Sequence, residues 1–388
     1  MILTIVLWLC LAILLFLAAV IIWAFVASSY TAPVTADEVH MVTTPDLWQV
    51  RLCRHKARKG PGHPVFMCHG FMSNQWNFAA PPGESMADLL AEQGYDCWLI
   101  DLRGARSAIP PFGHSINEGT IDDHLFRDIP AAIEYIRKTT GFDKVHWVGH
   151  SMGGMLLYAY DLVFGPKHIA SGTTLGAPIG FDGVNLHPPR FLLVFRSLSW
   201  HLFRAVQWIL IGILVRFKPK IEILPINWNN MNRKLAKTRD LFVAVDAPPL
   251  GVAQSLAAAA QTNKWHVKNG SVEVFESLRK LDVPLFAIFG AGDPFVPLNM
   301  AEGFFGNIPI KDKKLLILSK GNGHVADYSH VDLAMGSEIG TEIVQPMIKW
   351  FQAHPIGQRS DSNADEKTSP ARAKVKKPAA RKRAAKQP

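Results

Sequence analysis

The sequence predicts an α/β fold in which a mostly parallel sheet is covered by helices on both faces. Apolar runs that read as strands recur at residues 64–70, 95–104, 283–293 and 313–324. Two stretches with helical spacing of apolar residues, 85–94 and 124–141, follow the first and the second of these runs. Each stretch ends at a glycine. Strands that are apolar along their whole length are typical of a parallel sheet buried on both faces.

The order of the elements is consistent with this class. The segments VHMVTT (39–44) and WQVRLCRH (48–55) alternate with period two and predict an opening antiparallel pair. After the helix at 124–141, the run KVHWVGHSMGG predicts a strand that enters a sharp turn, and MLLYAYDLV predicts the helix beyond it. We expect the folded domain to cover residues 36–355.

An uncharged apolar segment precedes this domain. Residues 2–27 would form about 39 Å of helix, more than the ~30 Å that a bilayer core requires. A cleaved signal peptide would have a shorter apolar region after a basic start. We therefore expect residues 1–29 to be a single-pass transmembrane anchor. No basic residue precedes the span and Arg51 is the first to follow it, which gives only a slight preference for a cytoplasmic body.

An insertion of about a hundred residues, 180–281, interrupts the strand–helix alternation. Its segment 191–217 is apolar enough to suggest a second span, but Arg196 and Arg204 make that costly. These arginines and Gln207 fall on one arc of a helical projection. The pattern predicts an amphipathic helix that covers a pocket or lies on a membrane surface, within a helical cap over the core.

The positive charge of the chain is confined to its C-terminal end. Nine of the 41 Lys and Arg residues lie between 367 and 388, where there is no acidic residue, and the remaining 32 balance 32 acidic residues. We expect 356–388 to be a disordered basic tail, because it has too little apolar surface to fold. The tail is a solubilising segment or a candidate to bind anionic lipid or nucleic acid, and it does not indicate a nucleic-acid enzyme.

The motif Gly149-His150-Ser151-Met152-Gly153 fits G-x-S-x-G between a predicted strand and a predicted helix. At such a turn a serine takes a strained backbone conformation, and small neighbours let its hydroxyl project above the sheet. We therefore expect Ser151 to be a nucleophile.

A serine nucleophile needs a histidine base and a carboxylate that orients it. Asp293, in a glycine-rich turn after a buried strand, is the best acid, and His324 and His330 are both candidates for the base. The backbone N–H groups of Phe71 and Met152 are the expected oxyanion donors.

Together these residues resemble the α/β-hydrolase fold, and within it the acid lipase (AB-hydrolase-associated lipase) family. The resemblance runs from about residue 39 to 353 and rests on HGFMSNQW, YDCWLIDLRGARS, VHWVGHSMGG, GAGDPFVP and YSHVDLAMG. It implies Ser151 as nucleophile, Asp293 as acid, and Phe71 and Met152 as oxyanion donors. It also favours His330 over His324, because His330 stands in the family's His-x-Asp-hydrophobic stretch. Met152 replaces the family's usual glutamine, and the cap matches least.

The predicted function is a membrane-anchored serine hydrolase that cleaves carboxylic esters, as a lipase or esterase on lipid-like substrates. The alternatives are a hydrolase of polyesters or small soluble esters, an acyltransferase on the same fold, and a catalytically silent tethered binding protein. No cofactor or metal is expected. The expected partners are the ester substrate and a membrane, contacted through the N-terminal helix, with the cap as a second candidate contact. Cys53, Cys68 and Cys97 fall in apolar runs and are expected to be small buried side chains.

Overall fold

The computed structural model describes residues 2–182, 200–219, 224–235 and 238–357. An eight-stranded sheet has the order β1-β2-β4-β3-β5-β6-β9-β10. Every neighbouring pair from β4 to β10 is parallel, and β2 pairs antiparallel with both β1 and β4. The strands are β1 (Glu38–Thr43), β2 (Gln49–His55), β3 (His63–Cys68), β4 (Tyr95–Asp101), β5 (Val145–His150), β6 (Ile169–Leu175), β9 (Leu285–Gly290) and β10 (Lys313–Leu318).

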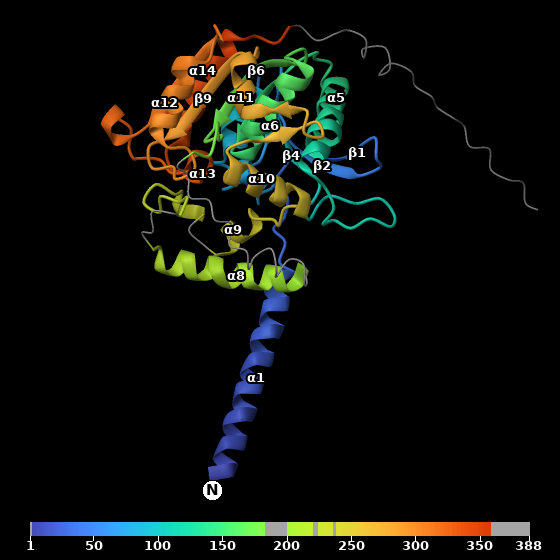
Figure 1. Cartoon of the computed structure of the whole chain (residues 1–388), viewed down its shortest axis with the longest axis vertical. Coiled ribbons are helices and arrows are strands. Elements are labelled where there is room, and N and C mark those ends of the chain that lie inside the picture. The colour runs from blue at the N-terminus through green and yellow to red at the C-terminus, as the bar shows by residue number, and fades with distance from the viewer. Residues whose placement is uncertain (1, 183–199, 220–223, 236–237, 358–388) are drawn as a thin grey trace, which may run out of the picture.

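Helices cover both faces of this sheet (Figure 1). One hydrophobic cluster contains buried residues of α5 (Ile129–Thr140), α6 (Met152–Phe164), α11 (Val274–Ser277) and α12 (Leu298–Asn307). The second contains those of α2 (Trp76–Ala79), α3 (Met86–Glu92), α13 (Asp332–Met335) and α14 (Gln345–Ala353). The shorter segments are α4 (Ile121–Asp123), η1 (His124–Asp128), η4 (Lys320–Asn322) and η5 (Gly340–Val344). The predicted α/β class and the opening antiparallel pair are confirmed.

Strand β6 is an element that the search for apolar runs does not predict. Its sequence, IASGTTL, is rich in small and hydroxyl side chains, yet it is almost wholly buried between β5 and β9. Gly172 has no room for a larger side chain, because a Cβ atom there would overlap the side chain of Leu157 on α6. Close packing of helix against strand therefore replaces the apolar bulk expected of a central strand.

The cap lies between β6 and β9, as predicted, at the end of the domain from which the N-terminal helix leaves (Figure 1). It contains α8 (Trp200–Phe217), η2 (Arg233–Leu235), α9 (Thr238–Val243), α10 (Leu250–Thr262), the small hairpin β7 (His266–Val267) and β8 (Val272–Glu273), α11 and η3 (Leu278–Lys280). The first part of the helix predicted at 191–217 and nearly all of the predicted basic tail, 358–388, lie outside the described residues.

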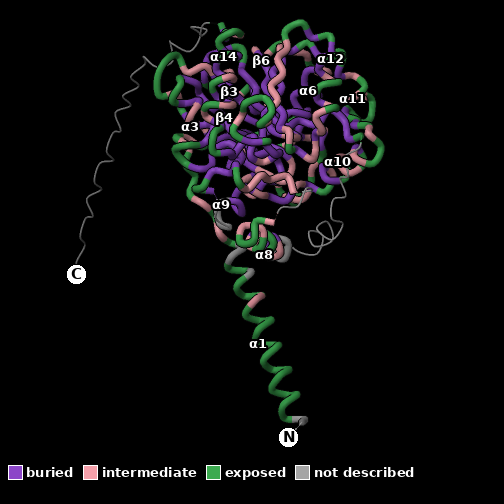
Figure 2. The backbone as a smooth tube through the Cα atoms, turned by 90° about the vertical axis from the view of Figure 1, so that its left-hand side faces the viewer, coloured by how far each residue is buried: buried purple, intermediate pink, exposed green. Residues whose placement is uncertain are grey.

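The N-terminal helix α1 (Ile2–Ser28) extends away from the domain, and its described side chains are almost all exposed (Figure 2). Its segment Thr4–Trp23 is long and apolar enough to cross a membrane, with a mean hydropathy of 3.3.

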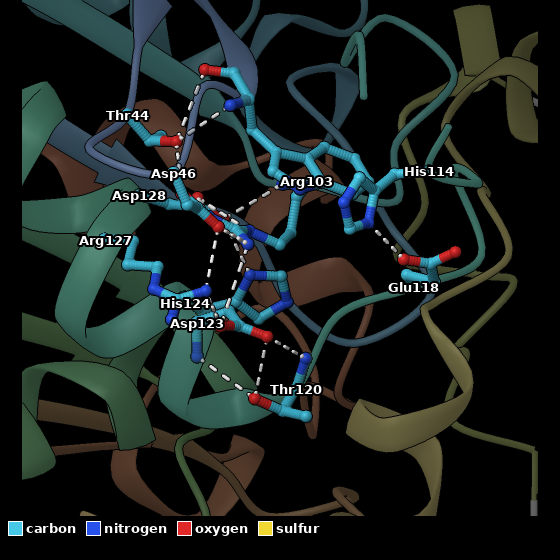
Figure 3. Close-up of polar contacts among 11 residues, drawn as sticks. Thr44, Asp46, Arg103, His114, Glu118, Thr120, Asp123, His124, Arg127 and Asp128 are labelled. Atoms are coloured by element: carbon cyan, nitrogen blue, oxygen red, sulfur yellow. Dashed lines mark hydrogen bonds and ion pairs between the residues drawn. The ribbon is translucent and has the colours of Figure 1, made fainter. Parts of the chain in front are cut away.

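A buried charge cluster fastens the opening hairpin to the rest of the sheet (Figure 3). Arg103, which follows β4 and is 2% exposed, lies 2.8 Å from Asp46 in the β1–β2 turn and 2.7 Å from Asp128 in η1. His124 Nδ1 lies 3.0 Å from the same Asp128 carboxylate. Burial raises the pKa of Asp46, but hydrogen bonds from Arg103 and Thr44 outweigh it and lower the pKa on balance. The cluster is a fixed ionic joint between three segments.

The three cysteines of the domain, Cys53, Cys68 and Cys97, are free and fully buried, as predicted. Burial raises the pKa of each thiol, that of Cys53 to about 12. Cys10 is the fourth cysteine and lies exposed on α1.

Candidate active site

Ser151 occupies the sharp turn between β5 and α6. Its backbone φ of +53° lies in the left-handed region, which a residue with a side chain rarely adopts. The Ser151 N–H donates to the Leu175 carbonyl of β6 (2.9 Å), and its own carbonyl accepts from Gly154 and Met155 in α6. These contacts over-determine the turn and hold the serine in the strained conformation.

The neighbouring glycines are required by close approach of the backbone. A Cβ atom at Gly149 would overlap the Gly153 carbonyl, and one at Gly153 would overlap the carbonyl of Cys68 at the end of β3. At Gly154 the added carbon would overlap Ala177 after β6. Side chains at these positions would push α6 off the sheet, so the glycines allow the serine to stand at the sheet's edge.

Asp293 and His330 form a buried pair at the same edge. Asp293 follows β9, and its Oδ2 lies 2.8 Å from Nδ1 of His330, in the loop between β10 and α13. The other carboxylate oxygen, Oδ1, accepts a hydrogen bond from the Phe295 N–H (2.8 Å). Both residues are about 5% exposed. A carboxylate on Nδ1 fixes the tautomer that leaves Nε2 free to accept a proton.

The pair lies beside the serine turn. The ring of His330 lies 4.8 Å, between centroids, from that of His150, the residue that precedes Ser151, with the two planes tilted by 46°. Gly176, which follows the Leu175 carbonyl that holds Ser151, has no room for a side chain, because a Cβ atom there would lie 3.0 Å from His330 Nδ1. The hydrogen bonds of the described residues do not include one between Ser151 Oγ and His330. Such bonds commonly tighten only when substrate is bound.

His324 has a different environment. Its Nδ1 lies 3.2 Å from Glu342 Oε1 in η5, a carboxylate that also accepts from Tyr328 (2.7 Å). Asp293 contacts His330 and not His324. The two candidate bases therefore lie in separate ion pairs. Only the pair that contains His330 adjoins the serine turn.

The predicted oxyanion donors lie on two sides of Ser151. Met152 begins α6, and the loop of residues 70–74, called the oxyanion loop below, passes so close that a Cβ atom at Gly70 would be 3.0 Å from Ser151 Cβ. Within the described part of the chain, no acceptor is recorded for the backbone N–H of Phe71 or of Met152. Two unpaired N–H groups beside a hydroxyl are suited to stabilise a developing oxyanion.

Two further polar residues, to which the sequence analysis assigns no role, hold this arrangement. His150 Nε2 lies 3.0 Å from the His330 carbonyl oxygen, and its Nδ1 lies 2.9 Å from Asn77 Oδ1, which accepts from the Gly70 N–H. Burial lowers the pKa of His150 to about 3, and nearby His330 acts in the same direction. A neutral imidazole carries one N–H, so His150 donates to one of these two oxygens and packs between the histidine loop and the oxyanion loop. In the sequence, only the position of His150 next to Ser151 suggests that it has a role.

Asp332 is the second such residue. It is fully buried, and its carboxylate accepts hydrogen bonds from the backbone of Ser329 and Asn227 and from the Asn230 side chain (2.7 Å). Burial raises its pKa to about 6, against the effect of these bonds. Asp332 thus ties the loop that carries His330 to the cap segment after α8. In the part of the chain that the structure describes, no group of three His, Cys, Asp or Glu residues could hold a metal ion.

Comparisons with known proteins agree with the fold. The model of the alpha/beta hydrolase fold family matches residues 63–198. Lipase 1 of Drosophila melanogaster is 24% identical over 369 residues, covering 84% of this chain and 79% of that protein. The poly(3-hydroxyalkanoate) polymerase subunit PhaC of Haloferax mediterranei is 21% identical over 354 residues, covering 86% and 68%. The solved esterase EaEST of Exiguobacterium antarcticum superposes with a TM-score of 0.55 at 18% identity, covering 80% and 98%.

The chain therefore has the α/β-hydrolase fold, as its strand order and the match to the family model show. Within that class, its lipase relatives support a serine ester hydrolase of the lipase-like kind.

Proposed function

We propose that this protein is a membrane-anchored hydrolase of carboxylic esters, with lipid-like esters as its substrates. The buried Asp293–His330 pair beside the strained Ser151 turn is the observation that carries the proposal. A buried carboxylate–imidazole pair of this kind is costly to build, and it has a direct use next to a serine hydroxyl.

The arrangement supports an acyl-enzyme mechanism. Ser151 Oγ attacks the ester carbonyl while His330 Nε2 takes its proton and passes it to the leaving alcohol. Asp293 stabilises the imidazolium that forms, and the N–H groups of Phe71 and Met152 stabilise the oxyanion. Water, activated by His330, then attacks the acyl-enzyme and releases the carboxylic acid and the free serine.

Hydrolysis of a p-nitrophenyl ester by single variants tests these roles. Ser151→Ala should lose activity by a factor on the order of 10⁶ and Asp293→Ala by about 10⁴. His330→Ala should resemble Ser151→Ala, whereas the matched control His324→Ala should stay within about threefold of the unmodified protein. Activity retained by Ser151→Ala would refute the proposal. Labelling by a fluorophosphonate that requires Ser151 would also exclude a catalytically silent binding protein.

Membrane attachment through α1 is part of the proposal. It is supported by the exposed apolar surface of the helix and by its length of 27 residues. The outer face of α8 adds Leu210, Ile213 and Phe217, three exposed apolar side chains at helical spacing next to α1. The full chain should float with phosphatidylcholine vesicles in a density gradient, and its intact mass should include residues 1–29. A mature protein that lacks these residues would instead identify a signal peptide.

A second substrate class is favoured by one relative, the polymerase subunit PhaC. Polyester chains or small soluble esters would use the same serine, and an acyltransferase would replace water with an alcohol acceptor. Rates across p-nitrophenyl esters of two to sixteen carbons distinguish these substrates from the proposed one. A preference for long, aggregated esters supports lipid-like substrates, and a preference for short soluble ones contradicts them.

A further inference from the structure

Helix α8 lies across the end of α1, between the anchor and the domain (Figure 1). Trp208 on α8 makes edge contacts with Trp23 of α1 at 6.4 Å and with Tyr30 after α1 at 6.2 Å between ring centroids. On its other side, Trp208 contacts Phe242 of α9 at 4.5 Å. One side chain thus contacts both the end of the anchor and the cap.

The inner face of α8 carries two polar side chains, those of Arg204 and Gln207. Arg204 is completely buried, and its Nη1 donates to the Val245 carbonyl (2.8 Å) and to Gln207 Oε1 (3.1 Å). Gln207 donates to the same Val245 carbonyl (3.0 Å). The guanidinium lies 3.7 Å over the ring of Phe242 and 3.6 Å from the carboxylate of Asp246.

This arginine is held at a cost. Its Nε and Nη2 atoms are buried without a hydrogen-bond partner among the described residues. An unpaired buried donor costs about 1–3 kcal/mol and more when it is charged. A helix that only covered the domain would be better served by an apolar side chain here, so the contact with Val245 and Asp246 has a function beyond packing.

Val245 and Asp246 in turn hold the oxyanion loop. The Asp246 N–H donates to the Met72 carbonyl (3.0 Å), Ser73 Oγ donates to the Ala244 carbonyl (3.0 Å), and Ser73 and Val245 form an antiparallel bridge. Asn74 Nδ2 donates to the Asp246 carboxylate (2.9 Å). Arg106 completes the group, because it donates to Asp246 (2.9 Å) and to the Tyr30 carbonyl beside the anchor (3.1 Å).

The point of attachment is strained. Met72 has a φ of +58°, which a side-chain-bearing residue keeps only when its surroundings enforce it. Met72 directly follows Phe71, whose N–H is the proposed oxyanion donor. Release of the cap segment would let Met72 relax to negative φ and would reorient the peptide groups around it.

We propose that Arg204 is a positioning residue, which sets the oxyanion loop from the helix that lies on the anchor. The contacts run from Arg204 to Val245 and Asp246 and from these to Met72 and Ser73. The inference rests on the proposed function, because it assigns a role to Phe71 in the same reaction. It implies that the seating of α8 on the anchor and the geometry of the oxyanion hole are coupled.

The test uses the full chain in detergent micelles, with active sites counted by fluorophosphonate labelling taken to completion. Arg204→Met should lower kcat per labelled site by about 10- to 100-fold with KM within threefold, since complete loss of one oxyanion donor costs about 10²–10³. Arg204→Lys, which keeps a donor for Val245, should recover part of the loss. The exposed Arg216→Met, on the same helix, is the matched control and should be unchanged.

Gln207→Leu is the second variant, because it keeps the charge of Arg204 and removes one donor to Val245. It should lower kcat in the same direction by a smaller factor. An unchanged kcat per labelled site in Arg204→Met or Gln207→Leu overturns the inference, and so does a loss that appears only in the number of labelled sites. Failure of the unmodified protein to be labelled at Ser151 would refute the proposed function instead, so the two failures are distinguishable.

Discussion

Arg103 and Arg204 are both buried, but their surroundings differ. Arg103 contacts three carboxylates, Asp46 at 2.8 Å, Asp128 at 2.7 Å and Asp123 at 3.7 Å (Figure 3). Burial disfavours its charge, yet these partners raise its pKa on balance. Arg204 has one carboxylate, at 3.6 Å, which it shares with Arg106, and burial together with Arg106 lowers its pKa to about 9.

This difference in pairing indicates different roles. The contacts of Arg103 stabilise the fold, whereas those of Arg204 orient a loop. When a fully paired buried charge is removed, its former partners remain charged in a low-dielectric interior without compensation, and the fold loses stability. A poorly paired one contributes little net stability, because its own desolvation offsets its hydrogen bonds. The same substitution should therefore lower the stability of the protein far more at Arg103 than at Arg204.

The largest effect is expected for Arg103→Met. It leaves the buried Asp128 with only His124 and a backbone N–H, so the free energy of unfolding should fall by about 3–5 kcal/mol. Denaturant unfolding followed by tryptophan fluorescence measures the loss. Arg127→Met is the control, since this exposed arginine contacts the same Asp46 and should cost less than about 1 kcal/mol. Equal losses in the two variants would contradict the distinction.

Asp46→Asn should have an intermediate effect that depends on pH. The folded protein lowers the pKa of Asp46 below its ordinary 3.8, so its carboxylate stabilises the fold above that pH and ceases to do so as the pH falls through the lowered value. We expect a loss of about 2 kcal/mol near neutral pH that shrinks below about pH 3. Unfolding curves of the variant and of the unmodified protein, recorded near neutral pH and below about pH 3, measure this loss of stability. A difference independent of pH would mean that the carboxylate's charge is not involved.

The smallest change in stability is expected for Arg204→Met. Although Arg204 is buried more completely than Arg103, removing it leaves Asp246 paired with Arg106 and relieves two unpaired donors. The free energy of unfolding should change by less than about 1 kcal/mol in either direction. A loss as large as that of Arg103→Met, in the same denaturation experiment, would place both arginines in the same structural role.

Much of the fold follows from local signals in the sequence. Whole-strand apolar runs predict the parallel sheet, and the glycines around Ser151 predict a crowded turn because each of them meets backbone or a neighbouring side chain. The Asp293 turn is recognisable because it directly follows a buried strand. These features depend on residues that are close together in the chain.

Other features depend on contacts between distant segments. Spacing alone does not distinguish His330 from His324, because the difference is which carboxylate each one meets. Strand β6 is short of apolar residues because α6 packs so closely on it. The helical arc of Arg204 and Gln207 is visible in the sequence, but only the position of α9 and Val245 shows that this arc faces inward and leaves apolar side chains outside.

The distribution of the four thiols offers a test of the proposed anchor that does not alter the protein. Cys53, Cys68 and Cys97 are shielded and held as unreactive thiols, so Cys10 on α1 is the site where a maleimide dye can attach to the folded chain. In intact vesicles a water-soluble maleimide should leave Cys10 unmodified, and dissolving the lipid should expose it. The unaltered protein thus contains its own reporter of insertion depth.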